Sequence, residues 1–456
     1  MRRLIGADFL VVGAGAAGMA FTDALVDHSD VTVALVDRRH SVGGHWLSAY
    51  PFVQLHQASE FYGVASTLLG GGRVQRAGPE AGLHERATVA EILTYYENVL
   101  RDRLLVSGRV ELFSSCEYVD ERQVVSLVSG ERFEVPEGCR VVDARYLSPD
   151  IPADSPPPFG VADGAHVIPV NALAVMGHAA SQYVVVGSGK TATDACIWLL
   201  GRGVDPDAIC WVRPRDPWML NRAKVQPDPP VFLGMAADIM EAAAAASSLD
   251  DLFLRLEDAG IMLRIDRSVT PTMAKAPTLA TWELGALRTI EHVVRLGHLR
   301  RAEPGRLVLE DGSVAVARDA VVVHCAASGL QNPPLVPVWG PSAITLQPIR
   351  AGFPCFGAAL VGYVEATRTD DEQKNRLCPP TPYGDTLAGW ATMNVRGTRA
   401  TASFGREPDI KAWMDQVALN PARIPAAHTD EVVEVIGRLQ AAVQRGLPRL
   451  ASLSGE

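Results

Sequence analysis

The sequence has no pair of cysteines spaced as Cys-x-x-Cys, although seven cysteines occur in its 456 residues. They are scattered over positions 116, 139, 196, 210, 325, 355 and 378. A redox-active dithiol and a common type of zinc site need closely spaced cysteines, and a disulfide framework needs an even set in a short chain. The sequence therefore excludes these three kinds of site, and we predict that the protein binds no metal ion.

Long apolar runs and an excess of positive charge are missing as well. No stretch gives the ~18 uncharged apolar residues that a membrane-spanning helix needs. The net charge of −10 provides no electrostatic reason to bind nucleic acid or an anionic membrane surface. Arg2 and Arg3 precede an apolar run, but that run is typical of a strand entering a glycine turn rather than of a signal peptide. We expect a cytoplasmic protein that binds neither nucleic acid nor membrane.

A glycine-rich turn near the start of the chain is the strongest motif present. A strand-like run over 8–12, apolar after Asp8, leads into Gly13-Ala14-Gly15-Ala16-Ala17-Gly18, and a helical stretch follows to about Val26. Gly13 allows the backbone to turn, Gly15 allows a pyrophosphate to approach, and Gly18 allows the helix to lie against the strand. Ala16 and Ala17 would begin the helix whose free amides face the phosphates. The pattern predicts a dinucleotide site.

The residues after this turn strengthen that prediction. A second apolar run over 31–36 ends at Asp37, about 20 residues beyond the glycines, where an acidic side chain accepts the hydroxyls of a ribose. A glycine-rich α/β turn without a ligand is the alternative. The second parallel strand and Asp37 favour a true site for the ADP part of a dinucleotide.

A second motif of the same kind lies in the middle of the chain. Here a strand over 183–186 enters a helix through Gly187-Ser188-Gly189-Lys190-Thr191-Ala192. A nucleoside-triphosphate P-loop would need glycine at position 184, which is Val184. The next apolar run, over 208–212, ends in Arg213-Pro214-Arg215 where the first motif has an acid. Arginines there provide donors for a phosphate and favour NADPH over NADH, unless Arg213 and Arg215 are solvated loop residues.

Each glycine motif is followed by a hairpin pattern and a closing strand. The first set covers 123–135 and 140–145, and the second covers 307–314 and 320–325. This repetition predicts an α/β fold with two Rossmann-like lobes, one inserted in the other. We expect the FAD lobe over 1–175 and 327–405, the NADPH lobe over 176–326, and a helical tail over 406–456.

Within the second lobe, an insertion at about 227–300 has helical spacing over 234–246, 249–259 and 281–296. It either borders a substrate cavity or covers the outside of the fold without contact to substrate. The tail over 406–456 either packs on the outside or forms a subunit contact, so a homodimer is possible.

Further segments resemble those of one flavoprotein group. After Asp37 come Gly43-Gly44-His45-Trp46, then Tyr50-Pro51, then a stretch with Leu55, His56, Ser59 and Tyr62. The sequence resembles FAD-dependent oxidoreductases with two dinucleotide domains, above all the flavin-containing and Baeyer-Villiger (class B) monooxygenases. The resemblance implies FAD in the first lobe, bound by the glycine turn, Asp37 and a further set: Arg38, Gly44, His45, Trp46, Leu55 and His56.

Two features mark the chain as a divergent relative. The strand that ends in Ala-Thr-Gly in those families ends here in Asp143-Ala144-Arg145. Their Phe-x-Gly-x-x-x-His signature before the second glycine turn is also absent, and His178 stands alone in that region.

The resemblance also implies a reaction. NADPH reduces the flavin, and oxygen then forms a C4a-(hydro)peroxyflavin that oxygenates nitrogen, sulfur or a carbonyl in a small organic substrate. His56 is the candidate for hydrogen bonding to the flavin or for acid-base work, or else a histidine that binds a backbone carbonyl. Asn221 and Arg222 are candidates for orienting the nicotinamide or the oxygen adduct, or else surface-loop residues.

Two other functions remain open on the sequence. The chain could be a flavin-dependent dehydrogenase or oxidase of a small metabolite that makes little use of NADPH. It could also be a flavin-binding protein without turnover, although the intact glycines of both motifs speak against that.

Overall fold

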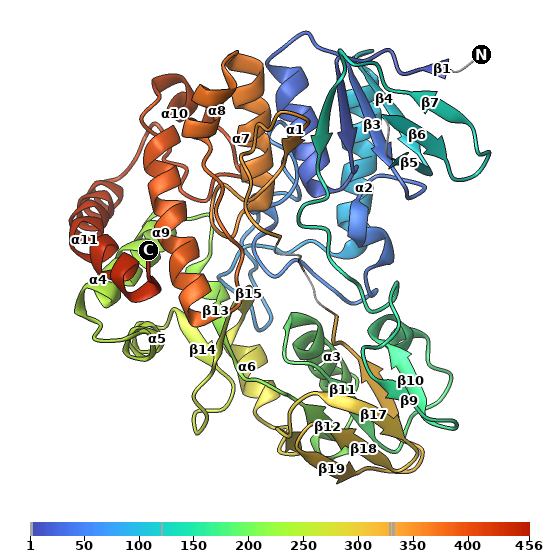
Figure 1. Ribbon diagram of the computed structural model, residues 1–456. Coiled ribbons are helices and arrows are strands. Elements are labelled where there is room, and N and C mark those ends of the chain that lie inside the picture. The colour runs from blue at the N-terminus through green and yellow to red at the C-terminus, as the bar shows by residue number, and fades with distance from the viewer. Residues whose placement is uncertain (1–2, 120–121, 328–329, 331–332) are drawn as a thin grey trace.

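The computed structural model describes residues 3–119, 122–327, 330 and 333–456. Its first sheet is parallel, with the strand order β21-β8-β2-β3-β4. Figure 1 labels two of these strands, β3 and β4, at its upper right. The strands are β2 (Phe9–Val12), β3 (Val33–Asp37), β4 (Val110–Ser114), β8 (Arg140–Asp143) and β21 (Ile344–Thr345). β2 and β3 are fully buried, which explains why they are continuous apolar runs. Because β21 comes from late in the chain, the first sheet encloses the second in sequence.

The second sheet is also parallel and has the order β10-β20-β11-β12-β16. Its strands are β10 (His166–Pro169), β11 (Tyr183–Val186), β12 (Ile209–Val212), β16 (Val293–Val294) and β20 (Val321–His324). β20 lies beside β11 as β8 lies beside β2. The predicted α/β fold with two Rossmann-like lobes is confirmed.

Three small sheets complete the strand structure. One has the order β1-β7-β6-β5, one β19-β18-β17-β9, and one β14-β13-β15. The first is built from β1 (Arg3–Leu4), β5 (Cys116–Val119), β6 (Gln123–Ser126) and β7 (Arg132–Glu134). The others are built from β9 (Gly160–Val161), β13 (Pro217–Asn221), β14 (Met262–Arg264), β15 (Met273–Leu279), β17 (Leu299–Glu303), β18 (Arg306–Leu309) and β19 (Gly312–Ala315). Both predicted hairpins are present, as β6 with β7 and β18 with β19.

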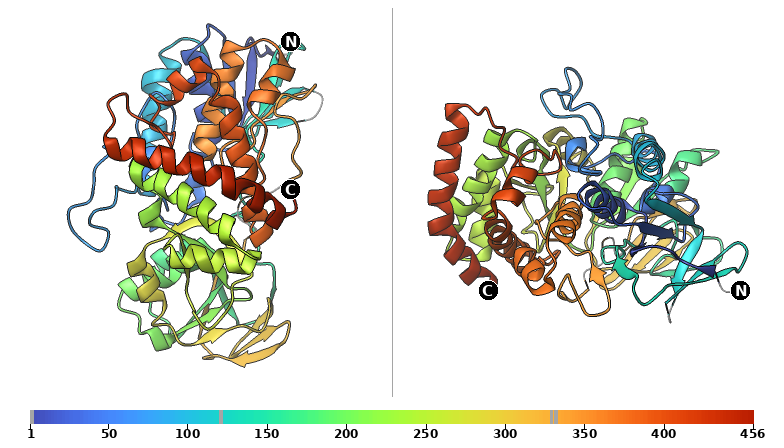
Figure 2. Two further views of the ribbon diagram at one scale, coloured as in Figure 1. Left: turned by 90° about the vertical axis from the view of Figure 1, so that its left-hand side faces the viewer. Right: turned by 90° about the horizontal axis from the view of Figure 1, so that it is seen from above.

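The helices cover the sheets and join the lobes. They are α1 (Ala16–Asp27), α2 (Val89–Val99), α3 (Lys190–Gly201), α4 (Pro229–Ala245), α5 (Leu249–Asp258), α6 (Thr281–Leu287), α7 (Pro354–Thr367), α8 (Asp371–Leu377), α9 (Leu387–Phe404), α10 (Pro408–Met414) and α11 (Asp430–Ser454). α7 packs on α1, where a Cβ on Gly362 would lie 2.5 Å from the Phe21 carbonyl oxygen. α11 lies along α4 (Figure 2), and a Cβ on Gly446 would lie 2.0 Å from the Met240 carbonyl oxygen. Glycine at these two positions lets the return segment and the tail dock closely.

Two expectations for the insertion are wrong. The helix expected over 281–296 ends at Leu287, and Val293–Val294 form β16 at the edge of the second sheet. The β-branched residues in this segment suit a strand, and the free edge of β12 provides the partner. The insertion also contributes β14 and β15, which pair with β13 just ahead of it, so it is a mixed layer rather than a helical one.

In the part of the chain that is described, no helix combines the length and apolarity needed to cross a membrane.

Candidate functional site

The first glycine turn is shaped for a close anionic ligand. A Cβ on Gly18 would lie 1.8 Å from the Gly13 carbonyl oxygen, and Gly13 has a φ of +109°. Gly15 is the N-cap of α1, and no side chain among the described residues caps this helix. The first helical turn, with Ala16 and Ala17, also carries no acidic residue. Its amides are therefore free for a pyrophosphate, which the positive end of the helix dipole favours.

Asp37 lies at the carboxyl end of β3, beside that turn. Its Oδ2 accepts a hydrogen bond of 2.7 Å from the Ala14 amide, and its Oδ1 accepts one of 2.8 Å from the Arg39 amide. A carboxylate oxygen has two lone pairs, so both oxygens can accept a further hydrogen bond. The carboxylate is thus fixed in place and keeps lone pairs for further hydrogen bonds. Its role toward ribose hydroxyls stays a prediction.

The Gly43-Gly44 turn packs directly on the first glycine turn. Gly44 has a φ of +58°, and a Cβ there would lie 2.8 Å from the Gly15 Cα. The Gly43 amide donates 3.0 Å to the Ala14 carbonyl. Arg39 Nη1 donates 2.9 Å to the Gly44 carbonyl, whereas the predicted Arg38 is exposed. The sequence offers no signal that separates these two neighbouring arginines.

The residues after this turn form a buried aromatic layer. Trp46 Nε1 donates 2.6 Å to the Tyr62 hydroxyl, and the His45 ring lies 5.0 Å from the Trp46 ring between centroids. Burial, with a smaller effect of Arg39, lowers the pKa of His45 to about 4. His45 is therefore neutral at neutral pH. Leu55 is also buried, and its carbonyl lies in a polar network described below.

The second glycine turn leaves more space for a ligand than the first. Gly189 is the N-cap of α3, and a Cβ there would meet no described atom within 4 Å. The Ser188 hydroxyl is buried and has no partner among the described residues, and Thr191 lies in the first turn of α3. Lys190 is already engaged, because its Nζ binds Asp194 and lies 3.4 Å from Glu283. Gly189 and Ser188 are thus available to a ligand, but the lysine is held by two carboxylates.

Unpartnered polar groups gather at the carboxyl edge of the second sheet, where parallel sheets bind dinucleotides. Arg213 follows β12, is 1% exposed and lies over the Trp211 ring, 4.6 Å from its centroid. Its Nη2 is 3.0 Å from Asp216, while Nε and Nη1 find no acceptor in the described chain. His324 ends β20, and neither ring nitrogen has a partner among the described residues. His324 was not predicted, because a single histidine after a strand has no distinguishing signal.

The other predicted arginine does not join Arg213. Arg215 is about half exposed, and its Nη2 lies 4.0 Å from Asp385. The structure therefore turns one arginine inward over the sheet and the other outward. A joint phosphate clamp by both arginines is not formed in this conformation.

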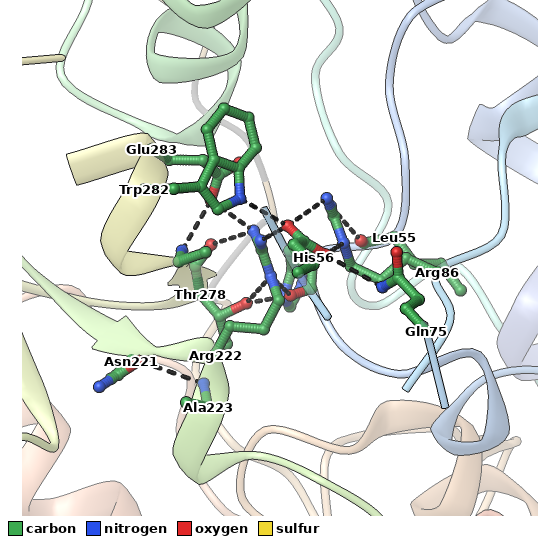
Figure 3. A network of polar contacts seen from close by, with 12 residues as sticks. Leu55, His56, Gln75, Arg86, Asn221, Arg222, Ala223, Thr278, Trp282 and Glu283 are labelled. Carbon is green, nitrogen blue, oxygen red and sulfur yellow. Dashed lines mark hydrogen bonds and ion pairs between the residues drawn. The ribbon is translucent and has the colours of Figure 1, made fainter. Parts of the chain in front are cut away.

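Arg222 lies at the centre of a buried ionic network between the lobes (Figure 3). It binds Glu80 through Nη1 and Glu283 through Nη2, the latter at 2.7 Å. Its Nε donates 3.0 Å to the His56 carbonyl, which the Thr278 hydroxyl also contacts. The alternative of a solvated surface loop is wrong for Arg222, because the residue is 0% exposed.

Glu80 and Glu283 each contact a second positively charged side chain besides Arg222. Arg86 binds Glu80 at 2.8 Å and donates 3.0 Å to the Leu55 carbonyl, and Lys190 faces Glu283. Asn221 lies next to Arg222 but is engaged locally, donating 2.8 Å to the Gly260 carbonyl and accepting from the Ala223 amide. The network links the chain on either side of the lobe boundary, and it includes Glu80, which the sequence did not single out.

His56 belongs to this network through its backbone. Burial, Lys190, Arg222 and Arg86 lower the pKa of its imidazole to about 3. Its buried Nδ1 has no hydrogen-bond partner within the described residues. His56 is therefore neutral at neutral pH, which leaves hydrogen bonding to a ligand open and disfavours the role of an imidazolium acid.

The network makes stability depend on pH in a defined direction. Burial alone would raise the pKa of Glu80 and Glu283, but Arg222 and the neighbouring cations outweigh it and hold both pKa values below the usual 4.5. The unfolded chain then binds more protons in acid, so this stabilisation is complete above pH 4.5 and is lost as pH falls through the folded pKa values. We expect the urea midpoint to drop steeply below that pH. Glu283→Gln should make the drop shallower, and an unchanged slope would contradict the assignment.

A cavity of about 150 Å³ adjoins the network at Gln57 and Thr278. It lies where the insertion, α9 and the loop before α7 meet. Its walls are mainly apolar side chains of α4 and α9, and Arg350 contributes the guanidinium. Of the two alternatives left open for the insertion, the structure favours the one that borders a cavity.

Comparisons with known proteins agree with this description. Residues 11–63 match the model of an NAD(P)-binding Rossmann-like domain. The crystal structure of cyclohexanone monooxygenase with ε-caprolactone, in the Loose conformation, superposes with a TM-score of 0.50 at 15% identity, covering 87% of this chain and 98% of the other. The uncharacterized proteins Rv2000 of Mycobacterium tuberculosis and Mb2023 of Mycobacterium bovis are each 41% identical over 92% of this chain and 78% of their own length. The chain has the fold of cyclohexanone monooxygenase and belongs to the same family as these mycobacterial proteins.

Proposed function

We propose that this protein is an FAD-dependent, NADPH-using oxidoreductase that oxygenates a small organic substrate at a nitrogen, sulfur or carbonyl centre. The observation that carries the proposal is the largely apolar cavity where the insertion of the second lobe meets α9 and the loop before α7. All seven cysteines are buried free thiols, which leaves the flavin rather than a dithiol as the redox centre.

The residues of the first lobe fit FAD. The α1 amides would hold the pyrophosphate, and Asp37 would hold the ribose. The close packing of Gly15 on Gly44 leaves no room for side chains on this backbone cradle. When bound, FAD supplies a centre that accepts hydride and passes electrons to oxygen.

The second lobe supplies the hydride donor's site. Ser188, Arg213 and His324 offer polar atoms without partners at the sheet edge, which fits a phosphorylated dinucleotide. The cavity walls would exclude water from the reacting groups, and the neutral His56 offers a ring nitrogen for a hydrogen bond.

The test is anaerobic mixing of the flavin-loaded protein with NADPH, followed by oxygen and a panel of amines, sulfides and ketones. Rapid bleaching of the flavin and coupling of oxygen consumption to an oxygenated product support the proposal. A flavin that stays oxidised with NADPH contradicts it.

Arg213→Met should remove the preference for NADPH over NADH. Loss of charge-assisted hydrogen bonds to a phosphate weakens binding by about 2 kcal/mol, so we expect KM for NADPH to rise about thirtyfold and KM for NADH to change little. Steady-state kinetics with both cofactors measure this. Arg215→Met is the matched control, since Arg215 points outward. Equal effects on both cofactors would indicate a structural role for Arg213.

A second candidate is a flavin-dependent dehydrogenase or oxidase with little use of NADPH. The burial of Arg213 and the engagement of Lys190 by two carboxylates favour it. In that case a metabolite, and not NADPH, bleaches the flavin in the same anaerobic experiment.

A further inference from the structure

The cavity contains a guanidinium with no countercharge. Arg350 Nη1 donates 3.1 Å to the Thr401 hydroxyl, and no described carboxylate lies within the 4.0 Å of an ion pair. Burial alone lowers the pKa of Arg350, to about 10, so the side chain is still charged at neutral pH. Arg350 is partly buried, so its guanidinium faces the cavity with a charge that no described side chain balances. A bound anion would balance this charge with charge-assisted hydrogen bonds.

The lining of the cavity is divided into apolar and polar parts. Phe232 and Met235 of α4, together with Phe353, form an apolar wall of the cavity. α9 presents one stripe to the cavity, and Asn394, Thr398 and Thr401 follow each other on it at helical spacing. The polar residues of this stripe include the partner of Arg350. A ligand that fits has one anionic group and an apolar body.

The charge and size select a monoanion. A single guanidinium neutralises one negative charge, so a buried phosphate dianion would keep an unpaired charge. A carboxylate matches the planar fork of arginine in two parallel hydrogen bonds. The volume of about 150 Å³ restricts the body to a small hydrocarbon or aromatic group.

We propose that the cavity binds a small carboxylic acid, with its carboxylate on Arg350 and its apolar part between α4 and α9. That this acid is the substrate rests on the proposed function, whereas the binding itself does not. Arg350 then sets specificity for acids over neutral molecules of the same shape.

The experiment compares matched acids and amides on the full chain. Phenylacetate is paired with phenylacetamide, and hexanoate with hexanamide, by calorimetry and by perturbation of the flavin spectrum. We expect the acids to bind at least about tenfold more tightly, since the difference is one charge-assisted pair. Arg350→Met should remove this difference and leave the amides unchanged. Arg350→Lys, which keeps the charge, should retain part of it.

Arg396→Met is the control, because Arg396 lies on the same helix and binds Glu456 at 2.7 Å. It should behave as the unchanged protein. Equal affinity for acid and amide, or a preference that survives Arg350→Met, would overturn the proposal.

The reduced flavin is the other source of an anion. If it is the true partner, Arg350→Met will weaken formation of the flavin sulfite adduct while the acid preference persists, and the carboxylate site is refuted. Calorimetry does not depend on the redox state of the flavin. If the acids bind but NADPH does not reduce the flavin, the proposed function is refuted and the carboxylate site is not.

Discussion

Gly18→Ala is expected to yield a protein without FAD. The added Cβ would lie 1.8 Å from the Gly13 carbonyl oxygen, so the turn or the start of α1 must move. Both elements form the proposed pyrophosphate site, and misplacement of the α1 amides removes the hydrogen bonds that bind the anion. Flavin released from the purified protein, measured by its visible absorbance, should fall at least about tenfold, because several charge-assisted hydrogen bonds are lost.

The matched control is Gly189→Ala in the second glycine turn. A Cβ there meets no described atom within 4 Å, so the chain should fold and keep its FAD. Since this glycine faces the proposed nicotinamide dinucleotide, KM for NADPH should rise instead. If Gly18→Ala keeps a native melting temperature and full flavin content, the first turn does not bind the cofactor. If both variants lose FAD, the loss is not specific to the first turn.

The parts of the fold that sequence reasoning found are those with local steric causes. Gly18 is required because a side chain there would collide with the backbone of Gly13 in the same turn. Asp37 is the last residue of a buried strand, and that strand is visible in the sequence as an apolar run. The order of strand, glycine turn and closing strand repeats in the sequence, so the two sheets could be predicted from it. The helix over 281–296 failed because its apolar spacing also suits a short helix followed by an edge strand, and only the free edge of β12 decides between them.

The site residues that were missed depend on contacts between distant segments. Glu80 lies in no motif, and it is 142 residues away from Arg222, which it binds. Arg350 follows a short strand, and its place at a cavity depends on the packing of α4 and α9, which are distant in the sequence. His324 ends a strand, and nothing in its local sequence indicates that both ring nitrogens lack partners. Such residues are identified by burial and by the absence of a partner, which the sequence does not contain.

Arg222→Met is expected to give the largest loss of stability. Three carboxylates (Glu80, Asp194 and Glu283) and three cations (Arg86, Lys190 and Arg222) balance in this network. Methionine fills a similar volume but leaves one buried negative charge in excess. Breaking a buried pair in this way lowers the free energy of unfolding by about 3 kcal/mol or more. Urea denaturation followed by tryptophan fluorescence measures the change.

A double variant separates the charge effect from the loss of packing. Glu283→Gln combined with Arg222→Met leaves two carboxylates and two cations, so it should be less destabilised than the sum of the single variants, with a coupling of about 1–3 kcal/mol. Arg101→Met is the control, because Arg101 pairs with Asp102 at an exposed site, where solvent screens the charges and an ion pair contributes little to stability. If the single effects add without coupling, Arg222 acts through packing alone. A positive coupling means that balanced charge joins the two lobes at the point where the network borders the cavity, so that the lobe boundary and the proposed substrate site are stabilised by the same residues.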